Sequence, residues 1–305
     1  MRVTTVFVPK GFGQKIGDLA LQHDISEVSI SEARRMQGNS ETPLEVVTFQ
    51  SNTRNTKEFV ETLMDAAYYD PKTFSFSTRH PQSLFGREPV QKATYPLTRP
   101  TAEVYEELWQ FSQITLSLIC RVFLAALLVA YGIREDYMPL IIAGLLFLPY
   151  HHFLLGIGVG AATGEWKLLK KAGLAFFLGT LLILLSGVVV GLLTDKGIGF
   201  TQFTEARFGF SILISAIIGG AAGFGAIDDA GRRELIGLAA TAHLSVYPVW
   251  FGLKWVYGFE PADRPLESLG MFCMNTVLIT AFAILVLKLM RMRGSGIRRF
   301  VKAFR

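Results

Sequence analysis

The sequence predicts a polytopic α-helical membrane domain that follows a small α+β domain at the N-terminus. Half of the 305 residues are hydrophobic, but they are distributed unevenly along the chain. Residues 1–107 have the mixed composition of a soluble domain, with 12 Lys and Arg against 14 Asp and Glu. Residues 108–305 are rich in long apolar stretches, and their 18 Lys and Arg against 11 Asp and Glu account for the net charge of +5. In a membrane protein such a basic excess reports orientation rather than nucleic-acid binding.

The N-terminal residues 1–79 alternate between strand and helix patterns. Strands are expected at 3–8, 25–30, 44–49 and 72–77, and helices at 14–23 and 56–69. The resulting β-α-β-β-α-β order is the ferredoxin-like pattern. Domains of this kind sense ligands or pair with copies of themselves, and the fold alone does not decide between these functions. No apolar segment follows Met1, so we expect no cleavable signal peptide and a domain that stays in the cytoplasm.

Two further segments flank the membrane domain. Residues 80–113 are expected to be a proline-rich linker that ends in an amphipathic lead-in helix, starting near Thr101. Residues 291–305 form a basic tail, which we expect to lie as a surface helix on anionic lipid. The membrane domain itself is predicted to occupy residues 114–290.

Six segments of about 20 residues have the length and composition to cross a bilayer core. They run approximately over 114–133, 138–162, 174–193, 208–227, 235–257 and 269–287. The segments between and after them carry 12 Lys and Arg on the side of the C-terminal tail and five on the opposite side. By the positive-inside rule both termini lie in the cytoplasm of a multi-pass inner (plasma) membrane protein. Arg134, Lys196 and Arg264 should then lie outside.

The most informative feature is a pair of spans in which proline and histidine interrupt an apolar run. In the second span Pro149 precedes His151 and His152, and in the fifth span His243 precedes Pro248. Ionisable groups and helix breakers at this depth survive mainly where they line a cavity or bind something. If the six spans divide into three plus three, each half has a broken middle helix and the halves form an inverted repeat, as in many transporters. The alternative is that both prolines are simple kinks.

Depth along the helices places the ionisable groups of these spans at one level. At 1.5 Å per residue, His151 and His152 lie about 15 Å from the cytoplasmic end of their span, and His243 lies about 12 Å from the end of its own. Arg121, in the first span, lies about 10 Å deep. All four could face one cavity, or they could be unrelated side chains bonded to neighbouring backbone.

The chemistry of these groups leaves more than one ligand open. Arg121 together with imidazoles suits an anion, or a proton relay coupled to solute movement. Three imidazoles could also bind a transition metal. No HExxH, CxxC or Glu-x-x-His spacing supports a metal site, so we predict none. Cys120 and Cys273 are expected to be small buried hydrophobic residues.

Glycine patterns in the spans are expected to serve packing. The segments 187–191 and 219–223 have small residues four apart, a spacing that lets membrane helices approach closely. The run at 156–160 resembles a phosphate loop only superficially, because it follows no strand. Asn275 is a lone polar residue in the last span, and an interhelical hydrogen bond is its expected use.

The membrane half resembles the bacterial and archaeal family called domain of unknown function 389. The resemblance rests on Phe147-Leu148-Pro149, the glycine-rich run 156–164, Glu165-Trp166-Lys167-Leu168-Leu169, the segments 221–223 and 236–240, Val246-Tyr247-Pro248 and Asn275. It covers about residues 100–290 and implies a polytopic membrane protein with a cytoplasmic domain, but no established activity. This chain has His152 and Tyr247 where the family tends to have proline, so the architecture is implied while a shared site would be altered here.

We therefore predict a transporter or channel for a small solute, an anion among the candidates, gated by the cytoplasmic domain. The expected lining residues are Arg121, Pro149, His151, His152, His243, Tyr247, Pro248 and Asn275. The expected partners are the lipid bilayer, the solute or protons, and further copies of the chain in a homo-oligomer, without nucleic acid or cofactor. The alternatives are a membrane-anchored sensor or oligomeric scaffold without transport activity and, third, an intramembrane metalloenzyme.

Overall fold

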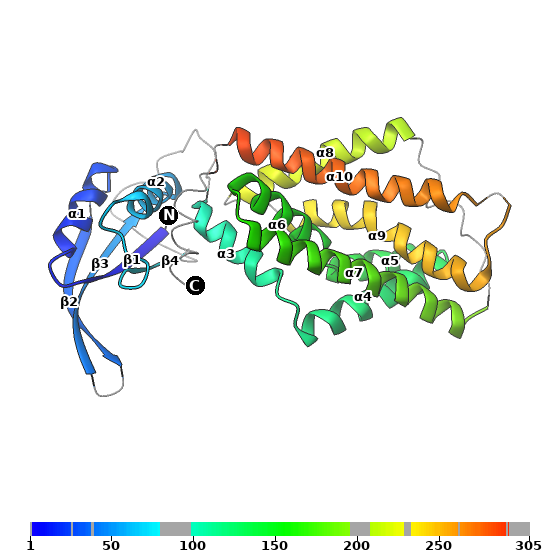
Figure 1. The fold of residues 1–305 in the computed structure, drawn as a ribbon, viewed down its shortest axis with the longest axis horizontal. Helices are drawn as coiled ribbons and strands as arrows, with labels where there is room; N and C mark the ends of the chain where they lie inside the picture. The colour runs from blue at the N-terminus through cyan, green and yellow to red at the C-terminus, as the bar shows by residue number, and fades with distance from the viewer. Residues whose placement is uncertain are drawn as a thin grey trace. The chain divides into compact units, whose positions relative to one another are not determined.

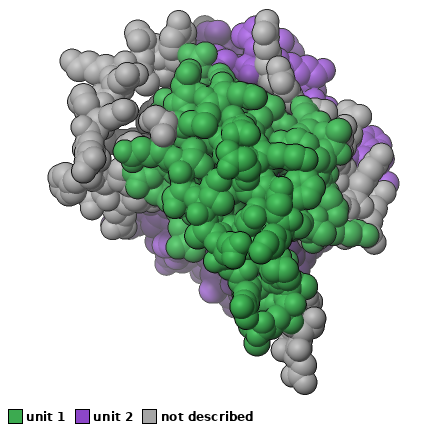
Figure 2. Space-filling model, turned by 90° about the vertical axis from the view of Figure 1, so that its left-hand side faces the viewer, with its two compact units in different colours: residues 1–104, 227–230, 293–305 green, residues 105–226, 231–292 purple. Residues whose placement is uncertain are grey.

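The chain folds into two compact units, each described here by itself. The structure is a computed structural model. It describes residues 2–25, 27–37, 40–79, 99–195, 208–228, 233–261, 263–290 and 292. Unit 1 comprises residues 1–104, 227–230 and 293–305, and unit 2 comprises residues 105–226 and 231–292 (Figure 2). Most of the expected linker, nearly all of the basic tail and the loop residues Lys196, Arg207 and Arg232 lie outside the described residues.

Unit 1 contains a four-stranded antiparallel sheet with two helices (Figure 1). Its elements are β1 (Arg2–Pro9), α1 (Gly13–Gln22), β2 (Val28–Gln37), β3 (Ser40–Ser51), α2 (Thr53–Asp65) and β4 (Ser75–Arg79). The predicted β-α-β-β-α-β order is confirmed. The strand order across the sheet is β2-β3-β1-β4, and every neighbouring pair among these strands is antiparallel.

The core of unit 1 lies on one face of this sheet. Residues alternate along β1 between buried and half-buried positions, as a strand with one covered face requires. Val6 and Val8 of β1 pack in one cluster with Ile16 of α1 and with Phe59 and Leu63 of α2. Both helices therefore cover the same face of the sheet, which explains why strand and helix periodicities could be read from this part of the sequence.

Glu45 of β3 forms a hydrogen bond with the backbone at the start of α1. Its carboxylate accepts a hydrogen bond of 2.5 Å from the backbone N–H of Gly13. Hydrogen bonds from the backbone of Gly11 and Gly13, with the nearby charge of Lys10, lower the pKa of Glu45. Because the folded-state pKa is depressed, the carboxylate stabilises the fold above its unfolded pKa of about 4.3, and this contribution is lost as the pH falls through the lower folded value.

Replacing Glu45 by glutamine is expected to destabilise unit 1 at pH 7 and to have little effect in acid. Glutamine keeps an acceptor oxygen but has no charge, so wild type and variant should converge as the pH falls below about 4. Hydrogen–deuterium exchange of the α1 amides in the full chain measures the difference. An exchange difference that stays constant between neutral and acidic pH would contradict this assignment.

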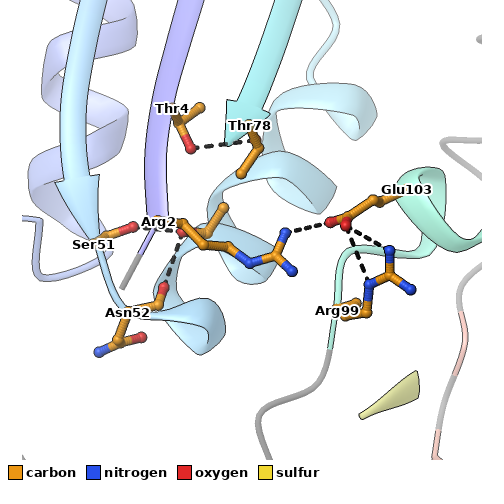
Figure 3. A network of polar contacts seen from close by, with 8 residues as sticks. Arg2, Thr4, Ser51, Asn52, Thr78, Arg99 and Glu103 are labelled. Atoms are coloured by element: carbon orange, nitrogen blue, oxygen red, sulfur yellow. Dashed lines mark hydrogen bonds and ion pairs between the residues drawn. The ribbon is translucent and has the colours of Figure 1, made fainter. Parts of the chain in front are cut away.

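A small ion-pair network joins β1 to the start of α3 (Thr101–Phe111) (Figure 3). The Glu103 carboxylate pairs with Arg2 and also with Arg99, whose Nη2 lies 2.6 Å away. The side chains of both arginines are largely buried, so the Glu103 carboxylate pairs with two cations that have little access to water. Thr101 adds a hydrogen bond of 3.0 Å to Glu61 of α2. The first turn of α3, up to residue 104, thereby belongs to unit 1.

Unit 2 is built from helices that run roughly along one common direction (Figure 1). They are α4 (Leu116–Arg134), α5 (Met138–Phe147), α6 (Tyr150–Thr163), α7 (Trp166–Leu193), α8 (Phe208–Ile227), α9 (Arg233–Tyr257) and α10 (Pro265–Leu289). Among the described residues, five helices are long and apolar enough to cross a membrane, and the bent pair α5 and α6 makes a sixth span if it is counted as one. This architecture is compatible with a multi-pass membrane protein and agrees with the six predicted segments.

The predicted break in the second span is confirmed. Helix α5 ends at Phe147, Leu148 adopts an extended conformation, and α6 begins at Tyr150 after a bend of 40°. The extended residue is the one before Pro149, as the steric effect of a proline ring predicts. The break leaves carbonyl groups without helical partners, and the hydroxyl of Thr241 on α9 donates to the carbonyl of Leu148 at 3.5 Å.

The predicted break in the fifth span is wrong. Helix α9 continues from Arg233 to Tyr257 with Pro248 in its interior. A proline there removes only the hydrogen bond to the carbonyl four residues earlier, that of Leu244, and neighbouring helices can hold the remaining turns in place. Only the second span is broken among the described residues, so the proline pair no longer supports an inverted repeat.

The expected packing role of the glycines is confirmed. A side chain at Gly187 of α7 would meet the carbonyl of Val249 on α9, and one at Gly252 would meet the carbonyl of Leu184 on α7. In the same way, Gly219 of α8 lies against the backbone of Ile279 on α10. In segments 187–191 and 219–223, small residues four apart therefore allow close backbone contact, of α7 with α9 and of α8 with α10.

Apolar side chains also cover the outside of unit 2. Among those with more than half of their surface exposed are Leu124, Phe177, Leu213, Val277 and Leu285. Cys120 and Cys273 lie on this outer surface, so the expectation that both cysteines are buried is wrong. The physical reason is that outer and inner faces of membrane-type helices are both apolar, and a small hydrophobic residue fits either.

Candidate functional site

A cluster of polar side chains lies inside unit 2, where α8, α9 and α10 meet. Asn275 of α10 accepts hydrogen bonds at its Oδ1 atom from Ser211 at 2.9 Å and from Ser215 at 3.1 Å. Ser215 also forms a hydrogen bond of 3.0 Å with Nε2 of His243 on α9. Tyr247, one turn further along α9, lies against Asn275 and Ser211. We call Ser211, Ser215, His243, Tyr247 and Asn275 the α8–α9–α10 cluster.

The cluster lies between its three helices, and most of its side chains are buried. Ser211, Ser215 and Asn275 are fully buried, Tyr247 is 4 % exposed, and His243 is partly exposed. At 1.5 Å per residue, His243 lies about 15 Å along α9 and Asn275 about 15 Å along α10. Both helices have 25 residues, so each of these positions falls near mid-length. The imidazole of His243 and the amide of Asn275 thus lie at the depth where a bilayer would hold little water, while Ser211 lies in the first turn of α8.

A second group of predicted residues surrounds the break between α5 and α6. Pro149 and His151 are buried, and His152 is partly buried. The His152 ring stacks on Phe111 of α3 with 3.9 Å between ring centroids, and the His151 ring lies 3.8 Å from that of His152. On its other side, the His151 ring fills the place where a side chain at Gly237 of α9 would stand. Only glycine at position 237 leaves room for α9 to pack against the His151 ring.

The two groups occupy different parts of α9. His243 follows Gly237 by six residues, which corresponds to about 9 Å along the helix and about 120° around it. His151 packs against Gly237, whereas His243 faces Ser215 of α8. The structure therefore divides the three predicted histidines between two sites instead of gathering them at one.

The other predicted residues belong to neither of these two groups. Pro248 is buried within α9, one residue beyond Tyr247. Arg121 is exposed on α4, whose buried side is formed by residues such as Val122, Ala125 and Val129. The guanidinium group is thus on the outer side of its helix, away from the polar cluster. Its depth along α4 could be predicted from the residue count, but the direction in which the side chain points could not.

A row of aromatic rings lies between the broken span and the cluster. Tyr150, the first residue of α6, packs on Phe176 of α7 with 5.0 Å between centroids, and Phe176 stacks on Phe272 of α10 at 6.2 Å. Phe272 in turn contacts Tyr247 of the cluster at 6.4 Å. The Tyr150 hydroxyl is satisfied by Thr180 of α7 at 2.5 Å. The row provides a continuous packed connection from the helix break to the cluster.

The lead-in helix α3 supplies the partners of the second group. Its residues from Tyr105 onward belong to unit 2. Tyr105 stacks on Trp109, and Lys171 of α7 lies 4.0 Å from the Trp109 ring centroid. Burial and the nearby Glu165 carboxylate raise the pKa of Tyr105 to about 12, so its hydroxyl stays protonated at neutral pH. The last turn of α3 presents Phe111 to His152, as described above.

Sequence reasoning missed the two serines of the cluster. Ser211 and Ser215 are four residues apart, a spacing that places both on one face of α8. Two serines on one face of an apolar span were a sequence signal for a buried polar contact. Thr241, which contacts the helix break, was also missed, because nothing in the sequence indicates that α9 passes this break. Among the described residues, no group of three or more His, Cys, Asp or Glu could hold a metal ion.

These features define a class: a polytopic helical protein, compatible with several membrane crossings, that buries a polar cluster between three of its spans. The family model described as Domain of unknown function (DUF389) matches residues 146–281, which include α6 to α9 and the part of α10 that carries Asn275. The resemblance to that family is thereby confirmed, and the family assigns no function. No curated protein matches the chain, and no solved structure matches it.

Proposed function

We propose that this chain is an integral membrane transporter or channel for a small solute, and that the solute passes through the α8–α9–α10 cluster. The observation that carries the proposal is the cluster itself: four buried polar side chains and a partly exposed imidazole between three apolar helices. Burying such groups is unfavourable unless they interact with one another or with a ligand, so they mark a functional path in membrane helices. His243 is the titratable member, and it gives proton coupling a physical basis.

The α+β unit is proposed to gate this path through α3. The first turn of that helix is held by the Arg2–Glu103–Arg99 network, and its last turn stacks on His152 beside the helix break. A ligand or an oligomer contact that shifts the first turn would therefore shift the partner of His152. The attraction of anions by Arg121, considered from the sequence, has less support, because that side chain is exposed on α4.

The orientation follows from the charge of the loops. We propose that both termini lie in the cytoplasm of a bacterial-type inner membrane, with the loop before α10 outside. In a chain whose Cys120 and Cys273 are replaced by serine, a membrane-impermeant maleimide on intact cells should label Arg264→Cys and spare Lys170→Cys. The reverse labelling pattern would show that the orientation is inverted.

Access of water to the cluster tests the transport proposal against the scaffold alternative. A cysteine at Ser215, in the same cysteine-free background, should react with a small charged methanethiosulfonate reagent in the folded protein, because a solute path must be hydrated at some stage. Ala126→Cys is the matched control, since Ala126 is fully buried in the apolar core of unit 2 and should stay inert. Equal inertness of both cysteines would favour a scaffold with a dry interior.

A further inference from the structure

Strand β2 forms the longer of the two outer edges of the sheet in unit 1. Among the described strands it pairs only with β3, so its other edge presents backbone N–H and C=O groups that have no strand partner. The strand has ten residues, without proline or glycine, whereas β4 at the opposite edge has five. Proteins protect sheet edges with short strands or with proline, and β2 has neither feature.

Two copies of β2 complement each other in one antiparallel register. In a two-fold symmetric pair of identical strands, one residue faces its own copy, and residues at equal distances before and after it face each other. With Ala33 at the centre, Glu32 of each copy faces Arg34 of the other. Centring the pair on Glu32, Arg34 or Arg35 would instead place like charges opposite each other. The order of charges along β2 therefore favours Ala33 as the centre.

The same register brings together the two exposed apolar side chains of β2. Ile30 and Met36 are 43 % and 66 % exposed, and each lies three residues from Ala33. They would face each other on the side of the sheet that carries α1, because a side chain at Gly13 of α1 would meet Ile30. Pairing of the two edges would thus cover apolar surface as well as backbone groups.

The present partners of the charged side chains leave them available to a second copy. Glu32 pairs with Lys10 at 3.2 Å and Arg34 pairs with Glu41 at 3.2 Å, and all four side chains are more than half exposed. Exposed pairs of this kind contribute little, and both a carboxylate and a guanidinium can take further partners. In addition, Glu32 lies opposite Glu45 of β3, so a cation from a second copy would offset a like-charge pair.

We propose that two copies of the chain associate through β2, in an antiparallel pair centred on Ala33 that joins their sheets. The partner is a second copy of this chain because the strand is complementary to itself in both charge and apolar surface. The interface belongs to unit 1 and goes beyond the proposed transport, since it stands whether or not unit 2 moves a solute.

Disulfide cross-linking of the full chain in membranes tests the register. With Cys120 and Cys273 replaced by serine, Ala33→Cys should form a covalent dimer on mild oxidation, because directly opposed residues have Cα atoms about 4.5–5.5 Å apart. Ser29→Cys is the matched control: it is exposed on the same face of β2, but would lie about 26 Å from its own copy at 3.3 Å per residue. Absence of the Ala33→Cys dimer would mean that the edge has another partner or is protected by its charges, and would overturn the proposal. Equal cross-linking of both cysteines would overturn it as well.

Reversing one charge at a time tests the complementarity. In the Ala33→Cys chain, Glu32→Arg or Arg34→Glu should lower the initial rate of cross-linking by about ten-fold or more, because both opposite-charge pairs become like-charge pairs. Differently tagged copies of the two variants in one membrane should cross-link to each other at about the rate of the parent chain. Arg35→Glu should have little effect, because Arg35 faces Ser31 in this register. Single reversals that cross-link as fast as the parent, or a mixture as slow as each variant alone, would contradict the proposed pairing.

Discussion

Replacing Lys254 by methionine is expected to destabilise the chain by about 3–5 kcal/mol, because it leaves a buried carboxylate without its partner. Lys254, near the end of α9, pairs with Asp263 at 2.8 Å, and the two side chains are 2 % and 8 % exposed. The same carboxylate accepts the backbone N–H of Glu260 at 2.6 Å, so it also holds the turn that leads into α10. Chemical unfolding of the purified chain in mixed micelles measures the loss.

A double variant tests whether the loss of the Lys254–Asp263 ion pair is the cause. Lys254→Met combined with Asp263→Asn removes both charges and keeps an acceptor for Glu260, so it should be more stable than Lys254→Met alone. Arg264→Met is the exposed control, because its pair with Glu267 is solvent-accessible and is worth at most about 1 kcal/mol. If the double variant were as unstable as Lys254→Met, the packing of the lysine stem rather than the ion pair would be the stabilising element.

Replacing His243 by leucine is expected to abolish solute movement, or its pH dependence between about pH 5 and 8, while the protein still folds. Folding should be preserved because Ser215 keeps its hydrogen bond of 3.1 Å to Asn275 after the imidazole is removed. Leucine fills much of the vacated volume with an apolar side chain. The expected fall in uptake is about ten-fold or more, which corresponds to the loss of one good hydrogen bond to the solute.

The matched control for His243 is Ser245→Ala on the same helix. Ser245 is buried, and its hydroxyl has no hydrogen bond among the described residues, so its removal should change neither folding nor uptake. Size-exclusion behaviour and thermal unfolding of the purified variants report folding separately from uptake. If His243→Leu transported at the wild-type rate over the whole pH range, the imidazole would have a purely structural role.

The two prolines show how far a single sequence can predict these spans. Pro149 ends a helix and Pro248 does not, although both follow apolar residues in spans of similar length. The difference comes from tertiary contacts. Thr241 of α9 offers a donor to the carbonyl freed at Leu148, whereas α9 packs closely against α7 just after Pro248, at Val249 and Gly252. Neither contact is visible in the local sequence.

Arg121 illustrates a second limit. Depth along a helix follows directly from the residue count, but rotation about the helix axis does not, because these spans are apolar on every face and have no polar side to fix the rotation. In unit 1, by contrast, one face of each strand and helix is polar, and the order of all six elements could be predicted from periodicity. Of the cluster, His243, Tyr247 and Asn275 could be predicted. The four-residue spacing of Ser211 and Ser215 was a usable signal, but their hydrogen bonds to Asn275 and His243 could not be predicted from it.

Solute uptake by the full chain in proteoliposomes tests the central claim, that the α8–α9–α10 cluster is a path across the membrane, most directly. The account predicts that wild type accumulates a small solute above protein-free liposomes, and that His243→Leu reduces this uptake while Ser245→Ala does not. Uptake that is equal in wild type and in His243→Leu, or absent with every solute tested while a cysteine at Ser215 stays unreactive, would contradict it.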